Sequence, residues 1–246
     1  MHDNIVEFTV YGDYALFSDP ITRAGGEKCS YQVPTYEALK GVLHSVYWKP
    51  TLLWVIDSVR VMNQIQMESK GIRPVKYTGR NDLSLYTYLK DCRYQVRAHF
   101  IWNENRPELA GDRNENKHHN YARRMIQKGG RRDIFLGCRE CQAYVEPCRF
   151  GEGAGYYDEV DILSFGLMYH GMTYADEAYS DETKDRMSIR LWYPVMKKGV
   201  IDFAPPTAFQ SGEERLITRP VRKMKIKPFG VRHGNFTGAA DREEAE

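Results

Sequence analysis

Residues 35–61 read TYEALKGVLHSVYWKPTLLWVIDSVRV, and this stretch decides how the first part of the chain folds. Thr35 is a residue type that caps the N-terminus of a helix, and apolar residues then recur at the spacing of one helix face. These apolar residues are Leu39, Val42, Leu43 and Val46. Pro50 ends the helix, and the run of β-branched and aromatic residues over 51–61 predicts a strand. We therefore expect a helix over 36–47 followed at once by a strand.

The segments on either side of this pair extend the pattern. Residues 5–11 alternate apolar and polar side chains and predict a half-buried strand that ends at Gly12, and residues 94–102 alternate in the same way. Residues 116–128 have a helical composition, and a fourth strand is expected within 141–150. The order strand, helix, strand, strand, helix, strand predicts an α+β protein with a ferredoxin-like (RRM-type) domain.

The composition divides the chain into three parts. The ferredoxin-like domain is expected over residues 1–150. The chain then becomes acidic and carries strand-like pieces at 188–192 and 199–203, which predict a small antiparallel β domain over 151–233. Residues 234–246 are polar and charged and are expected to form a disordered tail.

Basic residues are concentrated in two blocks. Residues 112–133 hold seven basic residues against three acidic ones, and residues 215–232 hold seven basic and no acidic residues. Between the blocks, residues 152–186 hold nine acidic residues against two basic ones. A solvated helix face would explain a single block, but two blocks rich in Arg favour a surface that binds a polyanion such as nucleic acid.

Membrane and secreted proteins are disfavoured as classes. No apolar run approaches the ~20 residues that cross a bilayer, and the first residues carry neither the basic nor the apolar region of a signal peptide. The five cysteines are an odd number in a chain of 246 residues, which favours reduced thiols. We expect a cytoplasmic protein without a membrane partner.

Candidate catalytic residues lie at the predicted start of the second helix, where residues 116–120 read NKHHN. A histidine exchanges a proton near neutral pH, Lys117 adds a fixed positive charge, and a helix N-terminus favours a phosphate. Cleavage of RNA by its own 2′-hydroxyl needs these groups. An exposed polar helix start would carry the same residues, and this motif by itself favours that interpretation.

A metal site is the rival interpretation of the same histidines. Side chains of adjacent helical residues point about 100° apart, so His118 and His119 are poorly placed to hold one ion. Cys138 and Cys141 form a C-x-x-C pair, with Cys148 beyond it, but no second pair completes a zinc site. We expect neither a metal nor another cofactor.

Residues 128–133 form a basic turn that reads KGGRRD. A helix C-terminus explains Gly129 and Gly130, but it does not explain Arg131 and Arg132, whose guanidinium groups fork onto phosphate oxygens. Residues 62–91, expected to form a loop or hairpin, carry further basic residues. The full set expected to contact RNA is Lys49, Lys70, Arg73, Arg123, Lys128, Gly129, Gly130, Arg131 and Arg132.

Several blocks of the chain resemble the CRISPR-associated protein 5 family, type I-C (Dvulg) subtype, between residues 5 and 225. The blocks are YGDYALF at 11–17, GGEK at 25–28, VYWKP at 46–50, QMESKG at 66–71, GGRRDIFLG at 129–137, RLW at 190–192 and RPV at 219–221. The resemblance implies an endoribonuclease that processes CRISPR repeat RNA and then caps the 5′ handle of the guide. Its expected partners are the repeat RNA, the mature guide and the other subunits of the type I-C surveillance complex.

The resemblance also implies which residues are catalytic. The tyrosine of the family's Y-W-K-P block falls on Tyr47, and its Lys-His pair falls on Lys117 and His118. His119 stands where close relatives carry Tyr, which leaves open which histidine acts. The alternative function is a subunit that caps the handle without catalysis, as in other type I systems; the presence of Tyr47, Lys117 and His118 together favours the enzyme.

The expected chemistry needs no metal. Attack by the 2′-hydroxyl leaves a 2′,3′-cyclic phosphate and a 5′-hydroxyl. A free tyrosine has a pKa near ~10, so we expect Tyr47 to orient the 2′-hydroxyl, His118 to transfer the proton and Lys117 to offset the phosphate charge. In a split βαβ fold both helices lie on one face of the sheet, so Tyr47 and His118 are expected to meet.

Overall fold

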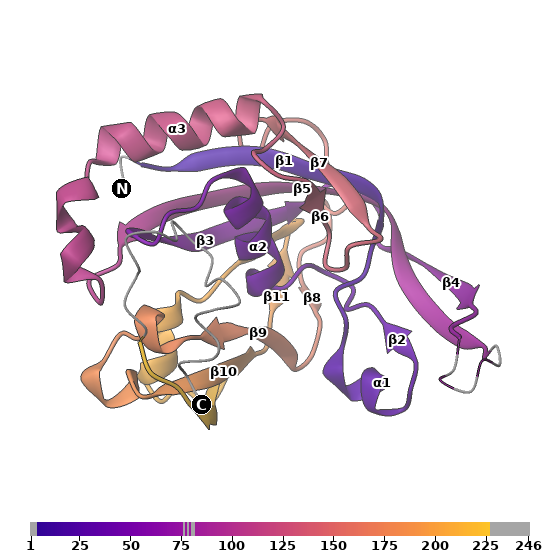
Figure 1. Ribbon diagram of the computed structural model, residues 1–246. Coiled ribbons are helices and arrows are strands. Elements are labelled where there is room, and N and C mark those ends of the chain that lie inside the picture. The colour runs from indigo at the N-terminus through magenta and orange to yellow at the C-terminus, as the bar shows by residue number, and fades with distance from the viewer. Residues whose placement is uncertain (1–3, 76, 78, 80–81, 227–246) are drawn as a thin grey trace.

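The computed structural model describes residues 4–75, 77, 79 and 82–226. Two β-sheets and a few helices make up this part of the chain, and most of the strand pairs are antiparallel (Figure 1). No helix among the described residues is long and apolar enough to cross a bilayer. The expected tail over 234–246 lies outside these residues.

The larger sheet has ten strands among the described residues. Its strand order is β6-β7-β1-β5-β3-β12-β11-β8, and β2 and β4 also pair with β5. The strands are β1 (Val6–Ala15), β2 (Lys28–Cys29), β3 (Leu52–Val61), β4 (Gln66–Ile72), β5 (Ser84–Trp102), β6 (Ile134–Phe135), β7 (Gln142–Pro147), β8 (Leu163–Ser164), β11 (Val195–Lys197) and β12 (Val200–Asp202).

Two helices pack on this sheet, α2 (Tyr36–Val46) and α3 (Glu115–Gln127). Thr35 caps α2, since its side chain accepts a hydrogen bond from the backbone N–H of Ala38. In Figure 1, α2 lies in front of the sheet and α3 runs along its upper edge. Buried residues of both helices join Phe8 and Phe100 in one hydrophobic cluster, so the two helices pack against the same core.

The strands predicted at residues 5–11 and 94–102 are shorter than the observed β1 and β5. β1 continues through Gly12 to Ala15, and a side chain at Gly12 would lie 2.7 Å from the backbone oxygen of Gln142 in β7. The expected strand over 94–102 is the second half of β5, whose first half pairs with β4. Residues 62–91 therefore contain a β-hairpin, which projects away from the rest of the molecule (Figure 1).

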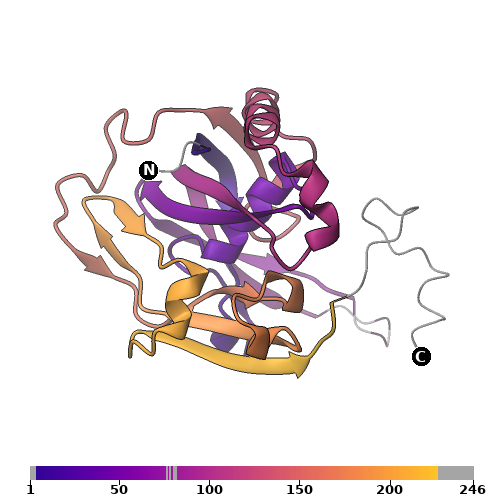
Figure 2. The ribbon, with the colours of Figure 1, turned by 90° about the vertical axis from the view of Figure 1, so that its left-hand side faces the viewer.

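The smaller sheet has the order β13-β10-β9. Its strands are β9 (Met168–Thr173), β10 (Arg186–Trp192) and β13 (Leu216–Lys223). Figure 2 shows it below the larger sheet. β12 pairs with β3, so the chain after residue 150 contributes strands to both sheets. The strand-like pieces at 188–192 and 199–203 are confirmed as β10 and β12.

Short helices complete the described fold. These are α1 (Pro20–Ala24) and the 3-10 helices η1 (Pro107–Asp112), η2 (Ala175–Glu177), η3 (Asp181–Thr183) and η4 (Pro206–Gln210). Of these, η1 matters most for function, because it ends just before α3 and supplies Asp112 to the site described next.

Candidate active site

Tyr47 lies at the point where α2 ends. Its backbone leaves the helical region, with φ −156° and ψ 124°, while its N–H still donates to Leu43. The buried indole of Trp54 donates a hydrogen bond of 2.7 Å to the Tyr47 carbonyl. These contacts hold the Tyr47 ring at one position, where it is only 5% exposed.

His118 is the fourth residue of α3 and points into the protein. The helix begins at Glu115, with the Asn114 side chain accepting from the backbone N–H of Lys117. The His118 side chain is fully buried, and its ring lies edge-on to Trp102 at 5.6 Å. The interpretation of this segment as an exposed polar helix start is therefore wrong for His118, although Lys117 is exposed.

The structure brings Tyr47 and His118 together. The phenol oxygen of Tyr47 lies 2.7 Å from Nδ1 of His118, and Nε2 of His118 lies 2.7 Å from the backbone oxygen of Asp112. A carbonyl oxygen can only accept a hydrogen bond, so Nε2 carries the proton of the neutral ring. Nδ1 is then an acceptor and receives the O–H of Tyr47.

The Asp112 carboxylate connects three further groups. It forms an ion pair with Lys117, accepts a hydrogen bond of 3.1 Å from Thr51 Oγ1 and lies 3.5 Å from His118 Nε2. Partial burial would raise the pKa of Asp112, but the hydrogen bonds from Lys117 and Thr51 outweigh it and lower the pKa. Lys117 thus reaches the site through Asp112, on the side of the imidazole ring away from the Tyr47 hydroxyl.

Tyr47 stays protonated at neutral pH. Burial, the nearby Asp112 carboxylate and Tyr121 raise the pKa of Tyr47 to about 12, while Arg131 opposes them. The ring of Tyr121 stacks on that of Tyr47, with centroids 6.0 Å apart and planes within 7°. Tyr121 is 43% exposed, and the guanidinium of Arg124 lies 4.4 Å from its ring centroid.

Asp112, Thr51 and Tyr121 were not predicted from the sequence. Tyr121 follows His118 by three residues, so helical periodicity places both on neighbouring parts of the helix surface and could have indicated it. Asp112 and Thr51 carry no comparable signal, because their contacts depend on how η1 and the start of β3 meet α3.

His119 has a different environment from His118. Its Nε2 lies 2.9 Å from the backbone oxygen of Ile5, and the side chain is partly buried. It therefore connects α3 to the residue that precedes β1. The histidine beside Tyr47 is His118.

The basic turn lies beside the end of α2. The backbone N–H groups of Arg131 and Arg132 both donate to the Ser45 carbonyl, at 3.2 and 3.1 Å. Gly129 and Gly130 have φ angles of +81° and +108°, a conformation that favours glycine. The turn is thus fixed two residues before Tyr47, and its Lys128, Arg131 and Arg132 are exposed. Lys49 and Arg123 are exposed as well, outside the turn.

Lys70 and Arg73 do not lie at this site. Lys70 in β4 pairs with Tyr86 of β5, sixteen residues before Trp102, which contacts His118. At ~3.3 Å per residue, these positions are roughly 50 Å apart along the strand. Lys70 lies over the ring of Tyr14 instead, with 3.3 Å from Nζ to the ring centroid, and Arg73 is exposed just beyond β4.

The five cysteines are all free thiols in the structure. Among the residues that the structure describes, no group of three or more His, Cys, Asp or Glu side chains could hold a metal ion. The residues gathered at Tyr47 are instead a phenol, an imidazole, a carboxylate and an ammonium, which together can accept a proton and offset negative charge.

Comparisons with known proteins agree on one family. A family model described as "CRISPR-associated protein (Cas_Cas5)" matches residues 5–204. A protein of Mannheimia succiniciproducens named "CRISPR pre-crRNA endoribonuclease Cas5d" is 30% identical over 168 residues, which cover 59% of this chain and 67% of that protein. A protein of the same name from Thermus thermophilus is 28% identical over 148 residues, covering 56% of this chain and 62% of that protein.

Two solved structures resemble the chain over most of its length. One is a CRISPR-associated protein, with a TM-score of 0.70 and 34% identity, covering 87% of this chain and 96% of that one. The other is a functionally uncharacterized protein from Streptococcus mutans, with a TM-score of 0.69, 38% identity and the same coverage.

Proposed function

The chain belongs to the Cas5d family of CRISPR-associated proteins, and from this membership we propose that it is an endoribonuclease that cleaves CRISPR repeat RNA. After cleavage it remains bound to the 5′ handle of the guide in a type I-C surveillance complex in the cytoplasm. The observation that carries the proposal is the 2.7 Å hydrogen bond between the Tyr47 phenol and Nδ1 of His118.

The proton of the RNA 2′-hydroxyl passes through Tyr47. His118 is fully buried and its Nδ1 already faces the Tyr47 hydroxyl, so the proton of the 2′-hydroxyl reaches the imidazole by way of that phenol. The 2′-hydroxyl gives its proton to the Tyr47 oxygen while Tyr47 gives its own proton to Nδ1 of His118. The 2′-oxygen then attacks the phosphorus, the bond to the 5′-oxygen breaks, and that oxygen takes a proton from water. The hydroxide left behind is neutralised by the proton that His118 gives back through Tyr47, which restores the neutral imidazole. The products are a 2′,3′-cyclic phosphate and a 5′-hydroxyl.

Asp112 and Lys117 stabilise the charges that form in this step. The imidazolium created at His118 has an oxygen of the Asp112 carboxylate 3.5 Å from its Nε2 nitrogen, which lowers the free energy of the charged ring. Lys117 pairs with the same carboxylate, and its side chain is 45% exposed. This exposure allows it to leave Asp112, on the far side of the imidazole ring, and to turn toward a bound phosphate, where it offsets the charge on the pentacoordinate phosphorus.

The alternative function is a subunit that caps the 5′ handle without cutting. The buried imidazole favours catalysis over this alternative, because a capping subunit needs basic residues at the surface but no proton acceptor behind a tyrosine. The exposed turn with Arg131 and Arg132 serves RNA binding under either function.

We also propose that the main domain is ferredoxin-like (RRM-type). Its elements follow the order β1-α2-β3-β5-α3-β7, and the four strands lie side by side as β7-β1-β5-β3, all antiparallel. This order supports a split βαβ arrangement, with β4, β6 and β12 as additions. We propose that the main domain ends at residue 150 and that β9, β10 and β13 form the centre of a smaller unit, while β8, β11 and β12 return to the larger sheet.

The proposed chemistry is tested with the purified protein and a repeat RNA from the CRISPR array of the same genome. Cleavage should persist in excess EDTA, because the site supplies its own proton acceptor and cation. A repeat RNA with a 2′-deoxy sugar at the cut position should bind with normal affinity but stay intact. Loss of cleavage in EDTA that magnesium or manganese restores would contradict the metal-free mechanism, and cutting of the 2′-deoxy RNA would show that water is the nucleophile.

A further inference from the structure

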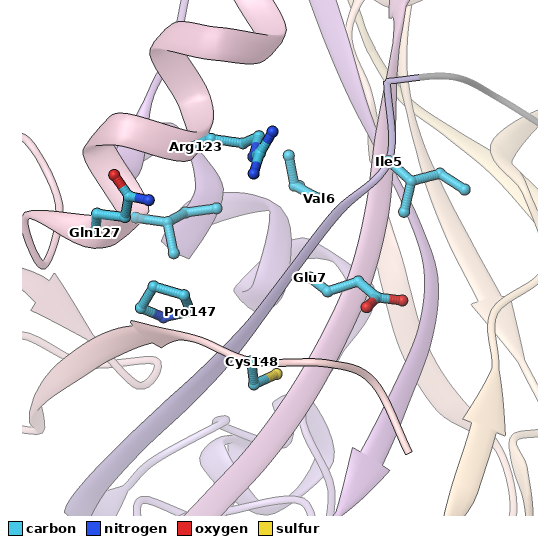
Figure 3. Close-up of a pocket in the computed structure, with 8 residues that line it drawn as sticks. Ile5, Val6, Glu7, Arg123, Gln127, Pro147 and Cys148 are labelled. Atoms are coloured by element: carbon cyan, nitrogen blue, oxygen red, sulfur yellow. The ribbon is translucent and has the colours of Figure 1, made fainter. Parts of the chain in front are cut away.

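A cavity of about 350 Å³ lies on the flank of α3 that faces away from Tyr47, between this helix, the start of β1 and the end of β7 (Figure 3). Val6, Ile126 and Pro147 supply the apolar part of its lining, although Val6 and Ile126 present little exposed surface. Its volume lies at the lower end of the range of small-ligand sites, which runs from ~300 to ~1,000 Å³. The cavity is therefore large enough for one small planar group.

Two polar side chains of α3 border this cavity. Arg123 reaches over it toward Val6, and Gln127 lies at its edge, one helical turn further on (Figure 3). Within the part of the chain that the structure describes, neither side chain has a hydrogen-bonding partner. The nearby carboxylate of Glu7 does not neutralise Arg123, because it accepts hydrogen bonds from Arg97 Nε at 2.9 Å and from the Phe150 N–H at 3.0 Å.

The cavity is connected to the catalytic site across the outer face of α3. Arg123 and Gln127 also border a second hollow, of about 440 Å³, together with Asn120 and Arg124. Arg124 in turn lies over the ring of Tyr121, which stacks on Tyr47. Polar and cationic side chains thus lead from Tyr47 over the helix to the cavity. Arg123 and Gln127 lie roughly 8 and 14 Å beyond His118 along the helix axis.

We propose that this cavity binds an unstacked nucleobase of the RNA, a few nucleotides from the cut. The proposal rests on the function proposed above. The base lies against Val6, Ile126 and Pro147, the Gln127 amide hydrogen-bonds its edge, and Arg123 holds the base or the phosphate next to it. An amide offers both a donor and an acceptor, so it can select among bases.

A single-stranded nucleotide fits this place better than a duplex does. Sequence-specific recognition of RNA depends on bases that are turned out of the stack, because the deep major groove of A-form RNA hides their edges. A cavity with an apolar wall and a polar rim, reached across a cationic surface, meets this requirement. It would give the enzyme a preference for one base near the cut that the proton-transfer groups cannot supply.

The test combines changes in the protein with loss of single bases from the RNA. Repeat RNAs that lack one base at each position in turn are measured for binding to the wild-type protein and to the variant Arg123→Ala/Gln127→Leu. Both new residues are good helix formers, so α3 should persist, and thermal unfolding checks this. At one position of the RNA, loss of the base should lower the affinity of the wild-type protein by about 5- to 100-fold. The variant has already lost the contacts to this base, so loss of the base should lower its affinity little further.

A matched control separates the cavity from general charge. Arg139→Ala removes one exposed positive charge on the turn after β6 and leaves the cavity unchanged. It should lower the affinity for intact and base-deleted RNAs by the same factor. If loss of that base also has little further effect on binding to Arg139→Ala, as it does for the cavity variant, the effect follows from charge alone. That result would overturn the proposal.

Cys148 gives a second measurement that needs no variant, because it also borders the cavity. Saturating intact RNA should slow alkylation of this thiol by N-ethylmaleimide. RNA that lacks the base identified by the binding measurements should not slow it. The wild-type protein could cut the repeat while the loss of each base weakens binding to the wild type and to the Arg123→Ala/Gln127→Leu variant equally. In that case the cavity is not a base site and the proposed function stands. If the protein neither binds nor cuts the repeat, the proposed function itself fails.

Discussion

Two histidines of this protein are buried to the same degree but have different surroundings. His118 in α3 and His170 in β9 are both 0% exposed. In each, Nε2 lies against a backbone carbonyl, that of Asp112 at 2.7 Å and that of Ala204 at 3.0 Å. Each ring is therefore held in the tautomer with a proton on Nε2 and an acceptor at Nδ1.

The group at Nδ1 differs between the two. His170 accepts from the Arg190 guanidinium at 3.2 Å and stacks on Tyr36 at 4.4 Å. Burial, and then the positive charge of Arg190, lower the pKa of His170 well below its usual value, so this ring stays neutral. His118 accepts from the Tyr47 phenol and has a carboxylate 3.5 Å from Nε2. Burial and a fixed tautomer are thus common to a structural and a candidate catalytic histidine, and the partner at Nδ1 distinguishes them.

The largest expected effect separates the two histidines by activity. His118→Ala should reduce the cleavage rate by ~10²- to 10⁴-fold, the usual contribution of a general acid–base group, while RNA affinity changes little. Lys117→Ala should also lower the rate more than the affinity. Single-turnover cleavage and equilibrium binding measure the two quantities.

The control for this prediction is the neighbouring histidine. His119→Ala removes the hydrogen bond to Ile5 and should have a milder effect on the rate. Tyr47→Phe keeps the ring and removes the hydroxyl, so it should be as inactive as His118→Ala. An inactive His119→Ala beside an active His118→Ala would show that the assignment is wrong by one residue.

His170 should show the opposite behaviour. His170→Ala removes a ring packed among aromatic side chains and leaves Arg190 Nε without its acceptor, so we expect a loss of about 2–4 kcal/mol in the free energy of unfolding. The cleavage rate per folded molecule should stay near that of the wild type. Urea denaturation measures the first quantity, and a rate loss as large as that of His118→Ala would contradict the contrast.

The surface near His118 is expected to bind phosphate, and the surroundings of His170 are not. Arg131→Glu/Arg132→Glu should weaken binding to many RNA sequences, because bonds to phosphates position the strand without reading it. Each phosphate of a single strand that the variant no longer neutralises should reduce the log–log salt slope by roughly 0.7. Binding is measured at several salt concentrations with the folded variant. An unchanged slope and affinity would show that this turn is ordinary solvated surface, and the RNA path would then be sought at Lys70 and Arg73.

The smallest expected effect concerns Asp112, the carboxylate that His170 lacks. The fold lowers the pKa of Asp112, so its contribution to stability is fully present above the unfolded-state value near ~4 and is lost as the pH falls through the lower folded-state value. The difference in unfolding free energy between the wild type and Asp112→Asn should be constant from pH 7 to about 4 and shrink below it. Denaturation at several pH values measures this difference, and one that stays constant to about pH 2 would contradict the assigned role.

The local elements were predictable because their signals are short-range. The helix at residues 36–46, its Thr35 cap and the strand at 52–61 follow from spacing and residue type within each segment. Residues 62–91 were predicted only as a loop or hairpin, without the bounds of β4 and of the first half of β5, because they mix Gln, Lys, Gly and Pro with apolar residues. The pairing of β4 with the first half of β5 depends on the register between the two strands, which the sequence does not reveal.

The sequence by itself determined which kinds of residue were candidates for chemistry: a tyrosine at a helix end, a Lys-His pair at a helix start, and a turn with two arginines. Only the tertiary structure decided which of them meet. It turned His118 inward and His119 toward Ile5, because adjacent positions on a helix point about 100° apart and the sheet lies on one side only. It also placed the Asp112 carbonyl against Nε2, which fixes the proton on that nitrogen and leaves Nδ1 for Tyr47, a relation between η1 and α3 that spacing along the chain does not encode.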